Sequence, residues 1–183
     1  MLHLGCGNNI LEGWANVDLA KASGVIRHDL SSGLPVNDAT ASIIFSEHFI
    51  EHLTRHQGLV LLRECYRALV PGGKLRISTP SLQKLVREYS NGQVDEWGDV
   101  SWEPGSPCAM VNEGLRSWGH QYVYDEHDLK GLMEEAGFVN IRRMPWRQSD
   151  HEALRGLECR PYHEDIILEG SKGTVRQGQA DKI

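Results

Sequence analysis

Two glycines close to the start of the chain, Gly5 and Gly7, directly follow a short apolar run, Leu2 to Leu4. Glycine at the end of a strand adopts backbone angles that other residues avoid, and it lets a ligand approach the main chain without a Cβ in the way. The spacing therefore predicts a loop that cradles a bound ligand. A Gly-x-Gly pair alone is a weak signal, so its meaning depends on the rest of the chain.

Two carboxylates, Asp18 and Asp29, end the next two apolar runs. The carboxyl ends of neighbouring parallel strands meet at one edge of a sheet, so both should converge on the glycine loop. A carboxylate accepts from both hydroxyls of a ribose, which suits Asp18, whereas Asp29 suits the amino group of adenine, with the amide of Leu30 near the ring. One such aspartate alone is more often a turn former or a helix cap. Two of them in register with the loop favour a nucleoside site.

The elements that would position these residues alternate between short apolar runs and amphipathic stretches, which is typical of an α/β fold with a parallel sheet. Strands are expected at residues 2–4, 15–19, 25–28, 41–45, 74–78, 138–144 and 165–169. Helices are expected at 56–70 and 125–137, with another that ends near Tyr89. Residues 1–172 are predicted to form a single domain, and 173–183 a flexible tail. Residues 81–124 are otherwise loop-rich, and they form either a lid over a pocket or a packed excursion anchored by Trp97, Trp102 and Trp118.

Composition excludes several classes of function. Of 183 residues, 40% are hydrophobic, and no run approaches the roughly 18 apolar residues that span a membrane. The net charge of −6 argues against nucleic acid, whose phosphates require clustered Lys and Arg. The first residues lack the pattern of a secretion signal, so a cytoplasmic location is expected. The four cysteines are scattered without a Cys-x-x-Cys pair, which predicts reduced thiols and no metal site.

Several further motifs follow in order along the chain, and together they resemble class I S-adenosylmethionine-dependent methyltransferases, within the group called methyltransferase type 11. The resemblance covers residues 2 to about 172 and rests on Leu4-Gly5-Cys6-Gly7, Asp18, His28-Asp29-Leu30 with Leu34-Pro35, Ile43 to His48 with Glu51-His52-Leu53, Leu69 to Leu75, and Glu134 to Phe138. It implies a Rossmann-like, mostly parallel sheet with an antiparallel last strand, and S-adenosylmethionine as the cofactor. The cofactor site that it implies comprises Gly5, Cys6, Gly7, Asp18, Leu19, Asp29, Leu30 and Ser46.

The chain departs from the family pattern near its start. Only 13 positions separate Gly5 from Asp18, and the third glycine of the loop is missing, so the first crossover helix should be very short or absent. The helical segment that usually precedes the first strand and covers the active site is also missing. Residues 81–124 or a second subunit, in a homodimer, would then have to supply the cover.

Methyl transfer from a sulfonium is an in-line displacement that needs alignment of the reactants and acceptance of one proton, but no covalent nucleophile. The resemblance places Glu47 and His48 nearest the methyl group, with His120 as a partner. A histidine can take a proton near neutral pH, although His48 could equally cap a helix or shape the pocket. The chain lacks the Asn-Pro-Pro-Tyr type of motif, so the expected acceptor is a small molecule or a sugar-containing metabolite.

Three alternatives come from other classes of protein. His48-x-x-Glu51-His52 has the spacing of a zinc hydrolase, but a third ligand is not evident and the glycine loop would stay unexplained, so we interpret the match as coincidental. A nicotinamide dehydrogenase requires Gly-x-Gly-x-x-Gly, and Ile10 occupies the third position. A module that binds S-adenosylmethionine or its demethylated product without catalysis remains open.

Overall fold

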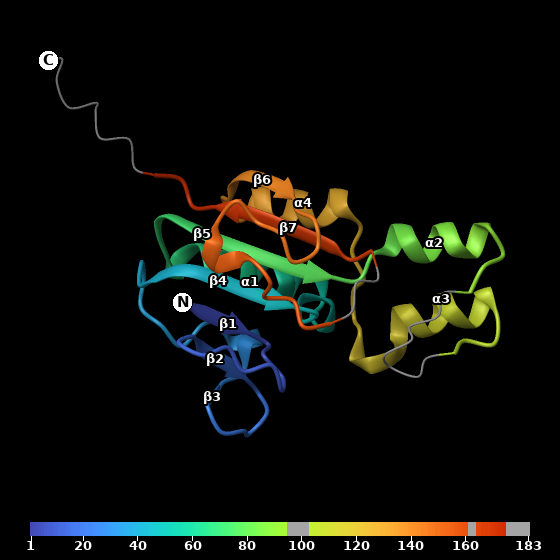
Figure 1. The fold of residues 1–183 in the computed structure, drawn as a ribbon, viewed down its shortest axis with the longest axis horizontal. Helices are drawn as coiled ribbons and strands as arrows, with labels where there is room; N and C mark the ends of the chain where they lie inside the picture. Colours follow the sequence, from blue (N-terminus) through green and yellow to red (C-terminus); the bar gives the residue numbers. More distant parts are fainter. Residues whose placement is uncertain (95–102, 161–163, 175–183) are drawn as a thin grey trace, which may run out of the picture.

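The computed structural model describes residues 1–94, 103–160 and 164–174. Its centre is a seven-stranded sheet with the order β3-β2-β1-β4-β5-β7-β6 (Figure 1). Strands β1 to β5 are parallel, whereas β7 runs antiparallel to both of its neighbours, so the predicted Rossmann-like sheet with an antiparallel last strand is confirmed. The strands are β1 Leu2–Leu4, β2 Ala15–Asp18, β3 Val25–Arg27, β4 Ala41–Glu47, β5 Leu69–Thr79, β6 Val139–Arg143 and β7 Ile166–Ser171.

In the described parts of the chain, four α-helices accompany the sheet, and each begins where a side chain caps the free backbone N–H groups. Thr54 caps α1 in a reciprocal pair with Gln57, and Asp125 caps α4 by accepting from the N–H of Asp128. The helices are α1 Arg55–Ala68, α2 Leu82–Ser90, α3 Pro107–Arg116 and α4 Glu126–Glu135. Short 3₁₀ helices span Leu30–Ser32, Ile50–His52, Ser117–Gly119 and Glu152–Leu154.

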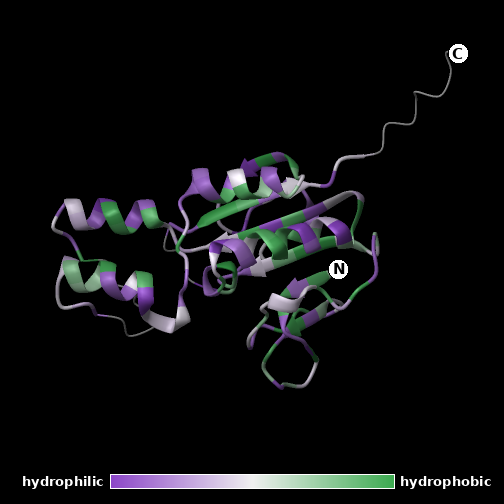
Figure 2. Ribbon diagram, turned by 180° about the vertical axis from the view of Figure 1, so that it is seen from behind, coloured by the Kyte–Doolittle hydropathy of each residue, from purple (hydrophilic) through white to green (hydrophobic). Residues whose placement is uncertain are grey.

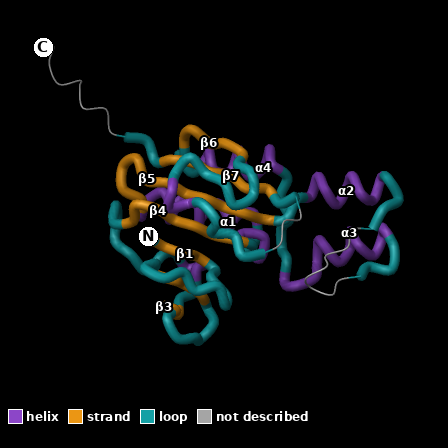
Figure 3. The backbone as a smooth tube through the Cα atoms, in the orientation of Figure 1, coloured by secondary structure: helices purple, strands orange, loops and turns teal. Residues whose placement is uncertain are grey.

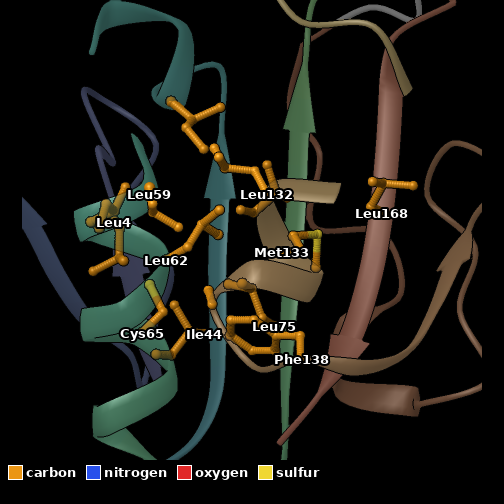
Figure 4. Packing of buried hydrophobic residues seen from close by; sticks show 14 of the residues in the cluster. Leu4, Ile44, Leu59, Leu62, Cys65, Leu75, Leu132, Met133, Phe138 and Leu168 are labelled. Atoms are coloured by element: carbon orange, nitrogen blue, oxygen red, sulfur yellow. The ribbon is translucent and has the colours of Figure 1, made fainter. Parts of the chain in front are cut away.

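The main hydrophobic core lies between one face of the sheet and the pair of helices α1 and α4, which contact each other (Figure 2). Figure 4 shows apolar side chains from the central strands meeting those of both helices. Burial of such side chains is the dominant favourable term in folding. The labelled members of this core are Leu4, Ile44, Leu59, Leu62, Cys65, Leu75, Leu132, Met133, Phe138 and Leu168.

The connection between β1 and β2 contains no helix, as the short spacing from Gly5 to Asp18 predicts. Residues 5–14 form turns instead, and the side chain of Asn16 fastens them by accepting from the N–H of Leu11 and donating to its carbonyl. The same Oδ1 of Asn16 also lies 3.2 Å from Nδ1 of the buried His3 on β1. These bonds hold the connection against the sheet without a crossover helix.

Two elements differ from the sequence prediction. Strand β5 begins at Leu69 rather than Lys74, because the Pro71-Gly72-Gly73 stretch forms an irregularity within the strand opposite β4 instead of preceding it. Helix α3 lies in the segment predicted to be loop-rich. It begins with Ser106 as cap and Pro107 at its first turn, which is a recognisable start that the prediction of a loop-rich segment did not use.

Helices α2 and α3 lie side by side beyond the carboxyl end of β5, away from the main body of the sheet (Figures 1 and 3). They share a small core of their own, made of Leu85, Met110 and Val123. Trp97 and Trp102 of the predicted lid, and residues 175–183 of the predicted tail, lie outside the described residues. Within the described parts of the chain, none of the helices has both the length and the apolar character that crossing a membrane requires.

Candidate cofactor site

The glycine loop follows β1 directly and is held by the neighbouring strand. The N–H groups of Gly5 and Cys6 both donate to the carbonyl of Val17 on β2. Gly5 and Gly7 have φ angles of +64° and +50°, which favour glycine. A Cβ on Gly5 would lie 2.4 Å from the ring of Phe49, whereas a Cβ on Gly7 would meet nothing within 4 Å. Gly5 therefore serves close packing, and Gly7 leaves the backbone open to a ligand.

Asp18 joins this loop to the end of β2. Its Oδ2 accepts from the N–H of Gly7 at 2.9 Å, and its Oδ1 accepts from the N–H of Ala20 at 2.8 Å. The side chain is only half-buried, and each carboxylate oxygen retains a second lone pair. The carboxylate is thus oriented by the backbone and still able to accept from two hydroxyls of a ligand.

Asp29 lies at the end of β3, two strands away from β1. It is exposed, and its Oδ1 accepts from both the N–H and the hydroxyl of Ser31, which lowers the pKa of Asp29. The side chain of Leu30 is buried in the core, so only its backbone is available to a ligand, whereas the side chain of Leu19 is 61% exposed. Among the described residues, no hydrogen bond joins Asp29 to the glycine loop.

A cavity of about 200 Å³ opens beside the glycine loop. At its base, the buried ring of His3 stacks on Phe45, and burial lowers the pKa of His3. Ser46 does not line the cavity, although its hydroxyl is buried without a hydrogen-bond partner. The lining residues are His3, Gly5, Cys6, Gly7, Asn8, Asn9, Glu47, Cys159 and Arg160.

Glu47 forms the wall of the cavity together with two residues far along the chain. Its carboxylate accepts from the N–H groups of Cys159 and Arg160, both at 3.1 Å, and from the Cys159 thiol at 3.2 Å. Partial burial and the bond to Glu47 raise the pKa of the Cys159 thiol to about 11, so the thiol stays protonated at neutral pH. Cys159 and Arg160 were not predicted to be site residues, because they lie 112 and 113 positions after Glu47 and no local spacing links them to it.

Residues 144–160, called the covering segment below, lie over the face of the sheet that is opposite α1 and α4 and that carries Arg76. The covering segment is attached through Arg76 on β5, whose guanidinium is fully buried. Arg76 donates to Glu158 and Glu169 at 2.5 Å each and to the carbonyl of Gln148 at 2.9 Å. A buried arginine requires such partners, so the ion cluster fixes the position of this wall.

His48 lies just beyond β4 in a buried position with a φ of +49°. Its Nε2 is 3.0 Å from Oδ2 of Asp165, and its Nδ1 is 3.7 Å from Oε1 of Glu51. Burial opposes a charge on the ring, but the hydrogen bond and negative charge of Asp165, with the charge of Glu51, raise the pKa of His48. The ring is therefore enclosed by two carboxylates, and it does not line the cavity.

His120 lies beside Glu51 and His52 rather than beside His48. Its Nδ1 is 2.9 Å from the carbonyl of Gly114, its ring is 5.2 Å from the ring of His52, and burial lowers its pKa. Glu51 is fully buried, and its Oε2 accepts from the hydroxyl of Thr79 at 2.9 Å. The His-x-x-Glu-His stretch is not an α-helix, so its two histidines do not share a helical face as in a zinc hydrolase.

Two larger hollows lie near the other edge of the sheet. Their volumes are about 480 and 550 Å³, and both are lined by Lys74, Asn140 and Ser171. Lys74 precedes the carboxyl-terminal half of β5, whereas ligands of parallel sheets bind outside the carboxyl ends of the strands. None of the residues predicted to bind or react lines them.

Residues 5–143 match the model of the methyltransferase domain family. The chain belongs to this family. The ubiquinone/menaquinone biosynthesis C-methyltransferase of Klebsiella pneumoniae subsp. pneumoniae is 29% identical to this methyltransferase over 117 residues, which are 61% of the chain and 44% of that protein. The chain thus spans less than half the length of this curated relative.

Solved structures share the fold of this methyltransferase. A SAM-dependent methyltransferase from Archaeoglobus fulgidus has a TM-score of 0.54 at 18% identity, with 93% of this chain and 85% of that chain covered. An S-adenosylmethionine-dependent methyltransferase from Mesorhizobium loti has a TM-score of 0.56 at 16% identity, with 93% and 89% covered. At these identities the likeness shows the fold alone.

Membership of the family confirms the predicted methyltransferase domain, and the fold agrees with that of class I methyltransferases. The activity of this chain and its use of S-adenosylmethionine belong to the proposal below. The structure brings Gly5, Cys6, Gly7 and Glu47 to one cavity and Asp18 to its rim. It does not bring His48 or His120 to that cavity. The roles of the individual site residues stay predictions.

Proposed function

We propose that this methyltransferase transfers the methyl group of S-adenosylmethionine to a small-molecule or sugar-containing acceptor by in-line displacement. The observation that carries the proposal is the hydrogen bond from the N–H of Gly7 to Asp18, beside the cavity at the carboxyl ends of β1 and β4. It joins an open stretch of backbone to an acceptor for hydroxyl groups at the edge where α/β sheets bind their ligands.

The cofactor would extend from the cavity across the ends of β2 and β3. A volume of about 200 Å³ is below the roughly 300–1,000 Å³ of whole small-molecule sites, so the cavity would hold only the amino-acid part. The ribose would bind Asp18, and adenine would cover the exposed side chain of Leu19 and reach Asp29 and the amide of Leu30. An exposed apolar side chain next to a polar group is typical of a binding site, because the bound ligand covers the apolar side chain.

Arg160 and Glu47 give the cavity one charge of each sign. The cationic side chain of Arg160 suits the carboxylate of the amino-acid part, because a guanidinium pairs with a carboxylate through two parallel hydrogen bonds. The anionic Glu47, which lines the same cavity, suits the amino group and the positively charged sulfur. The positions of both charged groups depend on the covering segment, because Arg160 belongs to it and the carboxylate of Glu47 accepts from the N–H of Arg160.

Bound S-adenosylmethionine supplies a methyl group that its sulfonium has already activated. What remains for the protein is to hold the acceptor in line with it and to keep water out. We propose that His48, enclosed by Asp165 and Glu51, positions the end of β4 rather than contacting the acceptor. His120 uses only one ring nitrogen in its hydrogen bond to Gly114. Of the two histidines, His120 rather than His48 is therefore able to interact with an acceptor or an ion.

We further propose that residues 81–124 form the cover over the acceptor side, within a single domain of residues 1–172. Two contacts support it: Leu82 donates to the carbonyl of Tyr124, and Gln121 and Tyr122 both donate to the carbonyl of Glu51, just beyond β4. The segment therefore starts and ends beside the strand ends that would carry the chemistry. A cytoplasmic location and a homodimer belong to the same proposal.

The proposal is tested by calorimetric titration of the purified chain with S-adenosylmethionine and S-adenosylhomocysteine, followed by transfer of labelled methyl to a panel of small molecules and sugar-containing compounds. Saturable binding of both ligands and label in one acceptor class are expected. Binding of both without transfer to any acceptor would favour a non-catalytic binding module. Lack of binding by folded protein would overturn the proposal.

A further inference from the structure

We infer that Glu51, His52 and His120 form a binding site for one divalent transition-metal ion of the zinc type. Each residue offers one potential ligand atom, and these three atoms lie within 4.8 Å of one another. Two neutral imidazoles and one carboxylate are a ligand set that binds zinc and related ions. The three residues come from two segments that meet only in the folded chain.

The distances require only a small closure. Zinc binds histidine nitrogen at about 2.0–2.1 Å and carboxylate oxygen at about 2.0–2.2 Å in a tetrahedron, so two ligands of one ion lie about 3.4 Å apart and the three atoms must approach one another by up to about 1.5 Å. The side chain of His52 is partly exposed, which leaves its ring room to rotate toward the other two ligands. Glu51 is fully buried and supplies the fixed point of the site.

The carboxylate of Glu51 provides independent support for a cation. Its Oε2 accepts from Thr79, but its Oε1 is buried without a hydrogen-bond partner. Nδ1 of His48 lies 3.7 Å from this Oε1, which exceeds hydrogen-bonding distance. A buried carboxylate oxygen without a partner is costly, and a metal ion would satisfy it.

The hydrogen bond of His120 leaves the correct nitrogen for a metal. A backbone carbonyl only accepts, so Nδ1 must donate its proton to the carbonyl of Gly114, at 2.9 Å. In the neutral ring, Nε2 then carries the free lone pair. A ring nitrogen that donates to a backbone carbonyl is the usual companion of a metal-binding histidine, because it fixes both tautomer and orientation.

Backbone hydrogen bonds hold the two ligand-bearing segments together. The N–H groups of Gln121 and Tyr122 both donate to the carbonyl of Glu51, at 2.8 and 3.1 Å. The side-chain amide of Gln121 donates to the carbonyl of His52 at 2.6 Å. The ligands are thus attached to a rigid frame, which a metal site needs for its geometry.

The inferred site differs from the zinc-hydrolase spacing. In that spacing the ligands would be His48 and His52, but Nε2 of His48 faces Asp165. The third ligand is His120 instead, 68 positions after His52. Three protein ligands leave a coordination position open for water or for an oxygen of the methyl acceptor, and this last use rests on the proposed function.

The test uses the full chain without a histidine tag, treated with chelator and titrated separately with Co²⁺ and Zn²⁺. Visible absorption would report Co²⁺ binding, and calorimetry would report Zn²⁺ binding. We expect one equivalent of each ion. His120→Ala and His52→Ala should each weaken binding at least about tenfold, and Glu51→Gln should do the same while keeping an oxygen for Thr79.

His56→Ala is the matched control, because His56 is exposed on the first turn of α1, four positions from His52. Affinity equal to that of the unchanged chain is expected for this variant. The inference is overturned if the unchanged chain binds no Co²⁺, or if His120→Ala binds as tightly as His56→Ala. Titration of chelator-treated variants with S-adenosylhomocysteine verifies that they are folded, and it tests the proposed function separately from the metal.

Discussion

The backbone N–H of Gly7 lies 2.9 Å from Oδ2 of Asp18, so the glycine loop and the end of β2 are directly joined. Asp18→Asn removes the charge and replaces one of the two accepting oxygens with a donor. Because the backbone N–H of Gly7 or Ala20 then loses its partner, we expect affinity for S-adenosylmethionine to fall about tenfold to a hundredfold, corresponding to about 1.4–3 kcal/mol. Calorimetric titration measures the change.

Asp150→Asn is the control for this substitution, since Asp150 is exposed and pairs with the exposed Arg142. It should leave cofactor affinity unchanged. Equal affinities for Asp18→Asn and Asp150→Asn would show that Asp18 does not contact the cofactor.

Gly5 and Gly7 should respond differently to alanine. Both have positive φ angles, which cost a side chain about 1–2 kcal/mol. A methyl group on Gly5 would also overlap the ring of Phe49, adding about 1–3 kcal/mol of overpacking. Gly5→Ala should therefore lower the free energy of unfolding more than Gly7→Ala, as measured by urea denaturation.

Cofactor affinity should show the opposite order, with Gly7→Ala affected more than Gly5→Ala. Gly7→Ala should fold well but bind S-adenosylhomocysteine weakly, because its methyl group occupies the open side of the loop. Phe49→Ala should restore part of the stability lost in Gly5→Ala. If Gly7→Ala binds as tightly as the unchanged chain, the ligand does not approach this backbone.

Glu158 should affect both stability and binding through Arg76. Glu158→Ala leaves the buried guanidinium with Glu169 as its remaining carboxylate, and we expect a loss of about 3 kcal/mol in the free energy of unfolding. Cofactor affinity should also fall, since Arg160 follows two positions later. Urea denaturation and calorimetry measure the two effects.

An exposed ion pair supplies the comparison. Arg142→Ala breaks the pair with Asp150 and should cost about 0–1 kcal/mol, without any effect on the cofactor. A Glu158→Ala variant as stable as Arg142→Ala would mean that the Arg76 cluster does not fix the covering segment.

Glu64 on α1 should make the stability of the chain depend on pH. Its carboxylate accepts from the N–H of Leu34, in the loop that follows Asp29. The hydrogen bond to Arg67 and the N–H of Leu34 lower the pKa of Glu64 despite some burial. A lowered folded-state pKa contributes stability above the unfolded pKa, and this contribution is lost as the pH falls through the folded value. Glu64→Gln should thus destabilise the chain at pH 7 and have little effect well below the ordinary pKa of glutamate.

Urea denaturation across this pH range measures the effect, with Glu135→Gln, in an exposed pair with Arg63, as the control. An equal loss of stability for Glu64→Gln at acidic and neutral pH would contradict the prediction.

Most of the sheet could be predicted because its signals are local. Alternating apolar runs predict the strands, and the cap at Asp125 predicts helix α4, all of which the structure contains. The short spacing from Gly5 to Asp18 predicts that no full helix joins β1 to β2, and none is present there. Helix α3 was not predicted because it lies in a segment rich in Gly, Pro, Ser and Asp, residues that favour loops, although Ser106 and Pro107 form a normal helix start. The position of Cys159 and Arg160 beside Glu47 was not predicted, because the buried Arg76 cluster brings that segment to Glu47 only in the folded chain.

The sequence by itself determined the family and the loop with its nearby carboxylate, because these depend on the short stretch from β1 to β2 and on motifs in a fixed order. Only the tertiary structure decided that His48 faces Asp165 while His120 joins Glu51 and His52. The physical reason is that side-chain partners across long separations follow from packing of the sheet and its covering segments. The spacing of residues along the chain does not predict that packing.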